Sequence, residues 1–422
     1  MLFTKAREAL RPLFDQIDQQ TKQNLAKVLD SYHAFGVGAH HFAGVSGYGH
    51  SDLGRDTLDQ VFAQIVGAEK AAVRVQMVSG THAIACALFG VLRPGDELLA
   101  VAGHPYDTLE EVIGLRGVGQ GSLAEWGIRY RELDLKSDGT VDFEGLALAI
   151  GPQTKMISIQ RSCGYSWRKS LTVQEIGEIV RLAKQVKPEV VCFVDNCYGE
   201  FVEDQEPTQV GVDLMAGSLI KNPGGTIAPV GGYVAGRADL VEQACCRLTA
   251  PGIGSEGGSS MDQNRLLFQG LFLAPQVVAE AVKGAHLAAW IFEHLGYTVK
   301  PGPFELRTDV IQAIHLGSAE KLVRFCQAIQ QRSPIGSYLD PVPDVVPGYE
   351  DAVVMAGGTF IEGSTLELSA DGPLREPYIA FLQGGTHLAH MELALERVLE
   401  LFEIGTSPPN PLIGVSVHGE EE

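Results

Sequence analysis

The segment Val190-Val191-Cys192-Phe193-Val194-Asp195-Asn196 sets five apolar residues directly before two polar ones, in a chain of 422 residues. β-branched and aromatic residues of this kind favour strands. Short, wholly apolar strands are typical of a parallel sheet, because helices bury both of its faces. We therefore predict a buried strand over 190–194, with Asp195 at its carboxyl end.

On both sides of this segment, strand-like and helix-like stretches alternate. Apolar runs predict strands over 71–77, 97–101 and 156–160. Apolar residues at helical spacing predict helices over 82–92 and 173–186, and another that begins at 108. This alternation indicates an α/β domain with a mostly parallel sheet.

Helices and a second unit flank the α/β domain. Helical spacing over 1–32 is followed by a loop rich in Gly and His, and a Gly/Ser loop precedes a long helical stretch over 263–294. Further strands and helices come after it. We predict an N-terminal helical arm and loop over 1–55, a large domain over 56–295, a smaller C-terminal α+β domain over 296–405 and a tail over 406–422.

Composition and charge exclude several classes of protein. The net charge of −20 would repel a phosphate polymer, so we expect no nucleic-acid partner. The apolar run 83–92 has about half the length of a membrane span, so we expect no membrane partner. The N-terminus lacks a signal-peptide core. Seven cysteines without framework spacing are typical of reduced thiols, which predicts a cytoplasmic protein.

Four histidines could suggest a metal site: His40, His41, His50 and His82. Two adjacent histidines do not share a face of a helix or a strand, and no acidic ligand stands at a matching spacing. We therefore expect no metal and assign these side chains to loops and to the lining of a site.

Ser79-Gly80-Thr81 lies between a predicted strand and a predicted helix. Backbone N–H groups at a helix N-terminus attract an anion, and the two hydroxyls can add hydrogen bonds. The alternative is an ordinary helix N-cap, a place where Ser and Thr are common. The segment is therefore a candidate phosphate-binding site.

Asp195 and Lys221 each follow an apolar segment. Open α/β sheets bind ligands at strand ends like that of Asp195. Its carboxylate could pair with a protonated pyridine nitrogen, or it could simply cap the next segment. Lys221 stands among apolar residues before a Gly-rich turn, with Ser218 as a possible phosphate contact. Burial lowers the pKa of a lysine and frees the amine to form a Schiff base. The alternative for Lys221 is a solvated lysine in a turn.

These three features stand in the order that pyridoxal 5′-phosphate (PLP) requires. A protein must hold the phosphate, the pyridine nitrogen and the aldehyde of PLP. The segment 79–81, Asp195 and Lys221 match those three groups, and each follows an apolar strand. The combination predicts that PLP is the cofactor and that Lys221 is its anchor.

The chain resembles the fold-type I PLP-dependent enzymes, and more specifically the aluminium-resistance / methionine γ-lyase-like family, relatives of the cystathionine lyases. The resemblance runs from about residue 10 to 405 and rests on the segments 47–58, 78–85, 105–111, 160–162 with 164–168, the Lys221 loop and 367–378. It implies a large domain with a mostly parallel seven-stranded sheet between helices and a smaller C-terminal α+β domain.

The resemblance also implies roles for individual residues. Catalytic Tyr106 would stack on the pyridine ring; a packed core tyrosine is the alternative. Tyr48 and Arg55 would reach the phosphate of the neighbouring subunit, as a Tyr/Arg pair does in cystathionine lyases, although their motif differs from this one. Arg375 would hold the substrate α-carboxylate through a bidentate pair; a surface ion pair with Glu376 is the alternative.

Gln160 and Arg161 end a strand beside that of Asp195. They could contact the cofactor ring oxygen, and they are also candidate substrate-binding residues. The implied reaction is carbon–sulfur bond cleavage in cystathionine, cysteine or methionine. Lys221 would act as the general base that removes the Cα proton. Loss of a thiol by β- or γ-elimination would follow.

Two other functions remain open, because a fold does not fix a reaction. One is another PLP reaction on an amino acid, such as that of an aminotransferase or an aldolase. The other is a PLP-binding protein with a regulatory or metal-tolerance role and little turnover. In either case the resemblance implies a homo-oligomer, at least a dimer and typically a tetramer, with the active site at the subunit interface.

Overall fold

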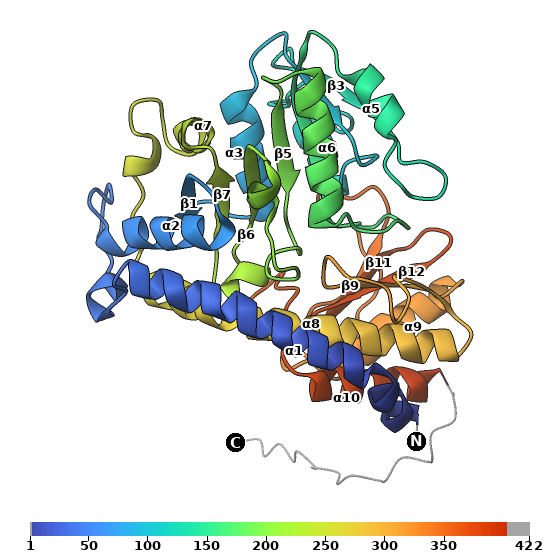
Figure 1. Cartoon of the computed structure of the whole chain (residues 1–422). Helices are drawn as coiled ribbons and strands as arrows, with labels where there is room; N and C mark the ends of the chain where they lie inside the picture. The colour runs from blue at the N-terminus through green and yellow to red at the C-terminus, as the bar shows by residue number, and fades with distance from the viewer. Residues whose placement is uncertain (1, 403–422) are drawn as a thin grey trace, which may run out of the picture.

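A computed structural model describes residues 2–402 of the chain, which form two β-sheets joined by long helices (Figure 1). The seven strands of the larger sheet lie within 70–236, and the five strands of the smaller sheet lie within 298–383. A large unit is thus followed by a smaller one, in the predicted order. The domain boundaries themselves stay a prediction, and the tail over 406–422 lies outside the described residues.

The larger sheet is mostly parallel, as predicted. Its strand order is β1-β7-β6-β5-β4-β2-β3, and only β7 runs antiparallel to its neighbours. Strand β5 lies in the middle, so its carboxyl end opens at the centre of the sheet edge. The strands are β1 (Lys70–Arg74), β2 (Glu97–Ala100), β3 (Arg129–Glu132), β4 (Thr154–Gln160), β5 (Val191–Asp195), β6 (Leu214–Ser218) and β7 (Gly232–Gly236).

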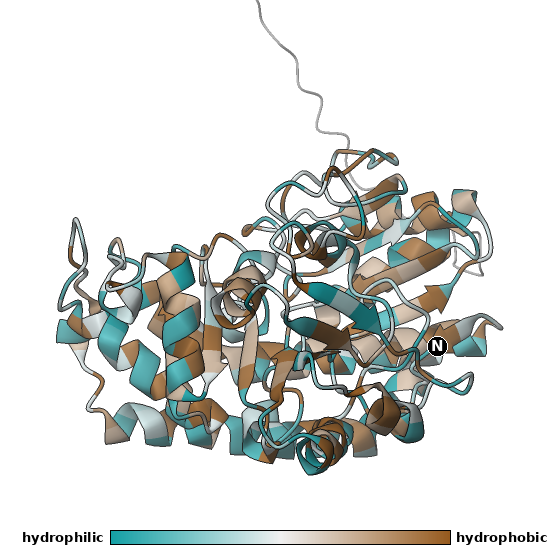
Figure 2. Ribbon diagram, turned by 90° about the horizontal axis from the view of Figure 1, so that it is seen from above, coloured by the Kyte–Doolittle hydropathy of each residue, from teal (hydrophilic) through white to brown (hydrophobic). Residues whose placement is uncertain are grey.

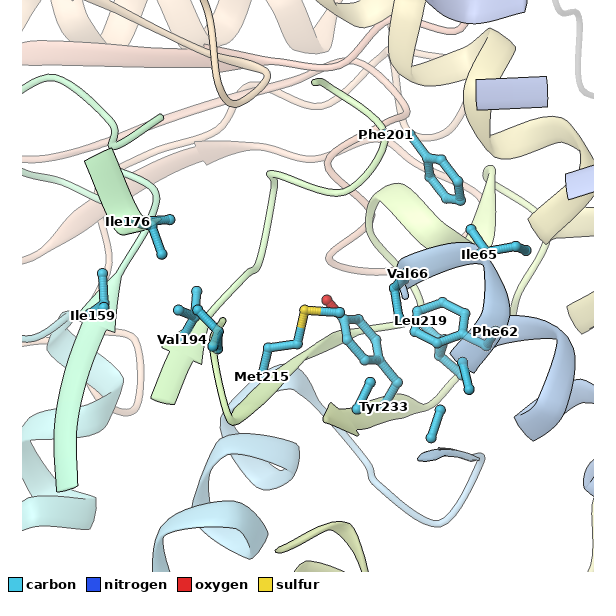
Figure 3. Close-up of a cluster of buried hydrophobic side chains, with 14 of the residues drawn as sticks. Phe62, Ile65, Val66, Ile159, Ile176, Val194, Phe201, Met215, Leu219 and Tyr233 are labelled. Atoms are coloured by element: carbon cyan, nitrogen blue, oxygen red, sulfur yellow. The ribbon is translucent and has the colours of Figure 1, made fainter. Parts of the chain in front are cut away.

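Strand β5 is buried on both faces. Val191 and Phe193 belong to one apolar cluster, while Cys192 and Val194 belong to another on the opposite face. Side chains of α3 (Gly80–Val91) and α7 (Ala238–Leu248) pack into the first cluster. Side chains of α2 (Leu53–Val66) and α6 (Val173–Val186) pack into the second, part of which is drawn in Figure 3. Double-sided burial therefore explains the uninterrupted apolar run.

Helix α6 shows how the local sequence determines where a covering helix begins and which of its faces is buried. Thr172 and Glu175 form a reciprocal capping box at its start. Its buried residues recur at helical spacing on one face, at Ile176, Ile179 and Ala183. The covering helices in Figure 2 accordingly carry both apolar and polar segments. Two shorter helices, α4 (Asp107–Ile113) and α5 (Phe143–Ala149), complete this unit.

Two long helices, α1 (Leu2–Ala34) and α8 (Asn264–His294), lie side by side beneath both sheets (Figure 1). Among the described residues, α8 is one helix that is long and apolar enough to cross a membrane. In this structure 61% of its most apolar window is buried inside the protein. Its apolar residues therefore serve the core that α8 shares with both units.

The smaller unit is an antiparallel sheet covered by helices. Its strand order is β10-β11-β12-β9-β8. The apolar core includes residues of both covering helices and Leu10 of α1. The elements are β8 (Thr298–Lys300), β9 (Ile311–His315), α9 (Ala319–Gln330), β10 (Val353–Ala356), β11 (Ser369–Pro373), β12 (Ile379–Gln383) and α10 (Leu388–Leu401).

Candidate active site

A cavity of about 510 Å³ lies between the carboxyl ends of the central parallel strands and the smaller sheet. This volume is within the range of small-molecule sites. Its place at the strand ends is where open α/β sheets bind ligands. The cavity brings together eight of the residues predicted from the sequence: Ser79, Gly80, Thr81, Tyr106, Gln160, Asp195, Ser218 and Lys221.

The N-terminus of α3 forms one end of the cavity. Ser79 is the N-cap, and its Oγ accepts a hydrogen bond from the His82 N–H at 3.0 Å. Gly80 permits a close approach to the sheet, because a Cβ there would stand 3.1 Å from Cys197 Sγ and 3.2 Å from Ser218 Cβ. Both alternatives for this segment therefore hold: Ser79 caps the helix, and the helix N-terminus faces a cavity that could receive an anion.

Asp195 is the last residue of β5 and lies beside Gln160 of β4 in the parallel register. Its carboxylate accepts a hydrogen bond from the Cys197 N–H at 3.1 Å. Burial raises the pKa of Asp195 above its ordinary value. Within residues 2–402 it makes no ion pair, so a cationic ligand group would supply the partner that a buried carboxylate needs.

Lys221 follows β6, and its Nζ lies 3.7 Å from the centre of the Tyr198 ring. Burial by itself lowers the pKa of Lys221, as expected from the sequence. Contacts with Tyr198, Cys197 and Asp195 favour the charged form more strongly, and the net pKa is raised. The sequence predicted a lowered pKa for Lys221, and in the folded chain the pKa is raised instead.

Tyr198 is a site residue that the sequence analysis missed. It lies in the turn after β5 with a φ of +73°, an unusual conformation for a tyrosine. The Asn222 side chain donates to the Tyr198 carbonyl at 2.9 Å and ties this turn to the Lys221 loop. The position of Tyr198, three residues after Asp195, was the signal that could have found it.

Aromatic rings form a second wall of the cavity. Tyr106 precedes α4, and the Gln160 side chain holds it by accepting from the Tyr106 N–H at 2.7 Å. Its ring centre lies 5.7 Å from that of Tyr165 and 6.1 Å from that of Tyr349. The hydroxyls of Tyr106 and Tyr349 share a hydrogen bond. Tyr106 is thus placed where a flat ring could stack.

The smaller sheet supplies a third wall, which the sequence analysis also missed. Asp371 lies on β11 and accepts a hydrogen bond from the Gln383 amide at 3.2 Å. Burial raises the pKa of Asp371 to about 7. Ser364, Thr365 and Ser369 stand beside it on the lining of the cavity.

Arg161 does not contact the cavity, contrary to expectation. It is fully buried, and its guanidinium donates to Asn196 at 2.7 Å and to Glu203 at 2.9 Å. Glu206 lies 3.5 Å away. The strand directs Gln160 into the cavity and Arg161 to the opposite face, because successive side chains of a strand alternate.

The Arg55 side chain also binds groups other than those predicted. Its guanidinium donates to the carbonyls of Gly49 and Gly258, at 2.6 and 2.8 Å, so its role in this chain is to hold two loops together. Arg375 is outside the cavity lining and pairs with Asp351 at 3.0 Å, rather than with Glu376. Tyr48 is 85% exposed and does not line the cavity of its own chain.

The cavity fits PLP. The N-terminus of α3 with Ser79, Thr81 and Ser218 could hold the phosphate. Asp195 could pair with the pyridine nitrogen, and Lys221 lies at the same cavity as the aldehyde anchor. No group of three or more His, Cys, Asp or Glu side chains in residues 2–402 is arranged to hold a metal ion.

Comparisons with known proteins agree with these features. The family model described as methionine gamma-lyase matches residues 1–403. The uncharacterized protein YnbB of Bacillus subtilis is 51% identical over 381 residues, which cover 90% of each chain. The solved structure of the carbon-sulfur lyase involved in aluminum resistance from Clostridium novyi NT is 45% identical, with a TM-score of 0.91, and 95% of each chain is covered.

The fold is that of the fold-type I PLP-dependent enzymes, as predicted. The PLP-dependent protein YhfS of Escherichia coli shares it at 17% identity, with a TM-score of 0.60, over 92% of this chain and 97% of that chain. The family and its relatives imply PLP and indicate a carbon–sulfur lyase. Because the family model covers almost the entire chain, this protein belongs to the methionine γ-lyase family.

Proposed function

We propose that this protein is a PLP-dependent carbon–sulfur lyase that cleaves a sulfur amino acid such as cystathionine, cysteine or methionine. The observation that carries the proposal is the convergence of Lys221, Asp195 and the N-terminus of α3 on one cavity, in a member of the methionine γ-lyase family. When bound, PLP supplies an electron-withdrawing ring that stabilises negative charge at the substrate Cα.

Residues of the chain would bind the cofactor, orient it and transfer the proton. Ser79, Thr81 and Ser218 would bind the phosphate, and Asp195 would hold a proton on the pyridine nitrogen. Tyr106 would fix the plane of the ring by stacking. Lys221 would anchor the cofactor and then take the Cα proton as general base.

Tyr198 would assist this proton transfer. Its ring lies against the Lys221 amine, and the contact favours the protonated form of Lys221. An amine that is stabilised when protonated is a stronger base towards the Cα proton. Elimination of the β- or γ-sulfur would then release a thiol.

Product analysis tests the proposal. PLP-loaded protein is incubated with L-methionine, L-cysteine and L-cystathionine, and 2-oxo acid and thiol are quantified, with Lys221→Ala as the control. We expect equimolar 2-oxo acid and thiol from at least one substrate, and none from the control. Consumption of an added 2-oxo acid without thiol would instead indicate transamination. Cofactor binding without turnover would indicate a regulatory or metal-tolerance role.

We also propose a homo-oligomer with the active site at the subunit interface, and a cytoplasmic location. The exposed Tyr48 supports the first, because a side chain that does not reach its own cavity is free to reach that of a neighbour. The cysteines support the second: all seven lie in the described residues, and each is a free thiol, as in reducing compartments.

A further inference from the structure

The turn after β5 holds two residues in an unfavourable backbone conformation. Tyr198 and Phe201 have φ values of +73° and +63°, in the left-handed region that residues other than Gly rarely adopt. Such residues persist where the surrounding structure fixes them. The segment 196–202, which we call the Tyr198 turn, therefore depends on contacts that hold it in place.

Glu200 stands between these two residues and ties the Tyr198 turn to the larger sheet. Its side chain is 1% exposed, and its Oε1 accepts a hydrogen bond from the Tyr233 hydroxyl of β7 at 2.6 Å. Tyr233 is itself wholly buried in the apolar core (Figure 3). Gly217 of β6 leaves room for the contact, because a Cβ there would stand 2.6 Å from Glu200 Oε1 and 2.7 Å from the Tyr233 hydroxyl.

Asn222 holds the same turn from the side of Lys221. Its side-chain amide donates to the carbonyls of Tyr198 and Glu200, both at 2.9 Å. Asn222 is wholly buried and directly follows Lys221 in the chain. The Tyr198 turn and the Lys221 loop are therefore connected, and the centre of the Tyr198 ring lies 3.7 Å from the Lys221 amine.

The environment of Glu200 favours a neutral carboxyl. Burial raises the pKa of Glu200 to about 8; the nearby Glu206 adds to the rise, and Arg161 opposes it. A neutral acid keeps its contact with Tyr233 without the cost of a buried charge. Glu200 does not line the cavity, so it can act on a ligand only through the residues that it holds.

We propose that Glu200 is a positioning residue, which through its bond to Tyr233 keeps Tyr198 against the Lys221 amine. The inference deepens the proposed function and rests on it, because Lys221 is the proposed cofactor anchor and general base. Contact with the face of an aromatic ring favours a protonated amine. Loss of the Glu200 contact should therefore release the Tyr198 turn and make the Lys221 amine easier to deprotonate.

The pKa of the Lys221 amine tests the proposal independently of catalysis. The full-length protein is freed of cofactor and labelled with acetic anhydride at a series of pH values, and the labelling of Lys221 is quantified by mass spectrometry. Tyr198→Leu should lower the pKa of Lys221 by about one pH unit, since it removes the ring. Glu200→Leu should change this pKa in the same direction, because the ring is no longer held.

Three further variants separate positioning from a general loss of stability. Glu200→Gln keeps an acceptor for the Tyr233 hydroxyl and should retain the original pKa of Lys221. Tyr233→Phe removes the donor with little change of shape and should lower that pKa as Glu200→Leu does. Asp59→Leu is the matched control: it breaks another buried contact, with Arg74 at 2.7 Å, and should leave the pKa of Lys221 unchanged.

The PLP-loaded protein gives a second readout, the pH at which its yellow band fades. Besides Tyr198, the titratable groups that face Lys221 are Cys197 and Asp195 at the end of β5, Asp371 of β11 and Tyr349 of the loop before β10. The variants leave these other groups in place, so a lower midpoint reports the loss of the Tyr198 contact. Glu200→Leu and Tyr233→Phe should lower the midpoint, and Glu200→Gln should not.

The outcomes separate this proposal from the proposed function. An unchanged pKa of Lys221 in Glu200→Leu and Tyr233→Phe, or an equal change in Asp59→Leu, would overturn the positioning role. An unchanged pKa in Tyr198→Leu would also overturn it, because the ring would then have no effect on the amine. The expected changes without thiol release from any substrate would keep the positioning role and reject the lyase.

Discussion

Arg161 directly follows strand β4 and is paired with acidic side chains in the interior of the protein. Its guanidinium is fully buried and faces Glu203 and Glu206 together with Asn196. Removal of one partner from such a group leaves the others as buried charges without compensation. Arg375 forms a half-exposed pair with Asp351, where water screens the charges.

We therefore predict losses of stability of very different size for two arginine substitutions. Arg161→Met should lower the free energy of unfolding by about 3–5 kcal/mol, as for other broken buried ion pairs. Arg375→Ala should lower it by about 0–1 kcal/mol, as for surface pairs. Urea unfolding followed by circular dichroism measures both. Equal losses in the two variants would contradict the structural role assigned to Arg161.

The buried Glu200 predicts that the stability of the protein depends on pH. It is 1% exposed and accepts a hydrogen bond from the Tyr233 hydroxyl at 2.6 Å. Burial raises its pKa from 4.5 to about 8. A carboxyl whose pKa is raised by folding contributes its stability fully below the unfolded pKa, and the contribution is lost as pH rises through the folded pKa.

Glu200→Gln should remove this dependence, because glutamine keeps the acceptor and cannot ionise. The melting temperature of the variant relative to the original protein should therefore rise as pH increases from 4.5 to about 8. Differential scanning fluorimetry across that range measures it. Parallel curves for the two proteins would show that Glu200 ionises as easily in the folded state as in the unfolded one.

At the level of single residues, the cavity lining at the strand ends of the larger sheet could be predicted, and the lining from the smaller sheet could not. Asp195 ends an apolar strand and Lys221 closely follows another, positions that a sequence displays directly. Asp371 comes from another sheet, far along the chain, and only packing of the two units brings it to the cavity. Arg161 failed as a prediction because the side to which a strand residue points depends on register.

Helix α3 and strands β5 and β6 form the end of the cavity at which we propose that the phosphate binds. Gly80 starts α3, and a Cβ at this position would stand 3.1 Å from Cys197 Sγ, a contact tighter than ordinary van der Waals distance. The helix can approach the strand ends this closely because Gly80 has no side chain.

Gly80→Ala should therefore displace the N-terminus of α3 and weaken PLP binding by about tenfold, equivalent to about 1.4 kcal/mol. The fold should change little, because the shift is confined to one helix end. Gly151→Ala is the matched control, since the nearest atom to its added Cβ is Thr154 Oγ1 at 4.0 Å. Dialysis against cofactor-free buffer, followed by absorbance, measures retention. Equal retention in the two variants would contradict this account of α3.

Apolar patterning predicted several of the buried elements, among them β5 and α6, and missed the polar strands. Strand β3 (Arg129–Glu132) lies at the edge of the larger sheet with mostly exposed side chains, so its sequence carries no apolar run. Strand β11 consists of Ser-Ala-Asp-Gly-Pro, residues that mostly disfavour strands. It is a strand because neighbours on both sides supply its hydrogen bonds, which no local pattern reveals.

In the whole molecule, the long helices α1 and α8 join the two sheets (Figure 1). The cavity lies between these sheets. The exposed Tyr48 lies in the loop that follows α1, and the exposed apolar residues Met261 and Ile253 lie in the Gly/Ser loop before α8. The Arg55 guanidinium bonds to carbonyls of both loops, so they form one surface. Exposed large side chains in adjoining loops are compatible with the subunit interface that we propose.

We predict that mixed oligomers will restore activity. Lys221→Ala removes the anchor, and Tyr48→Ala removes the contact expected from the neighbour, so each variant alone should be weakly active or inactive. A hybrid of the two should regain one intact site, because both changes fall in the other site. Activity after co-refolding measures the effect. A monomer by sedimentation, or no gain on mixing, would contradict a shared site.

The most direct test of the central claim is the cofactor bond itself. The visible absorbance spectrum of the purified protein is recorded before and after borohydride reduction, and the reduced protein is digested and its peptides are mapped. We predict a yellow protein whose band disappears on reduction and leaves a pyridoxyl group on Lys221. A colourless protein that takes up no added PLP, or a pyridoxyl group on another lysine, would contradict the account.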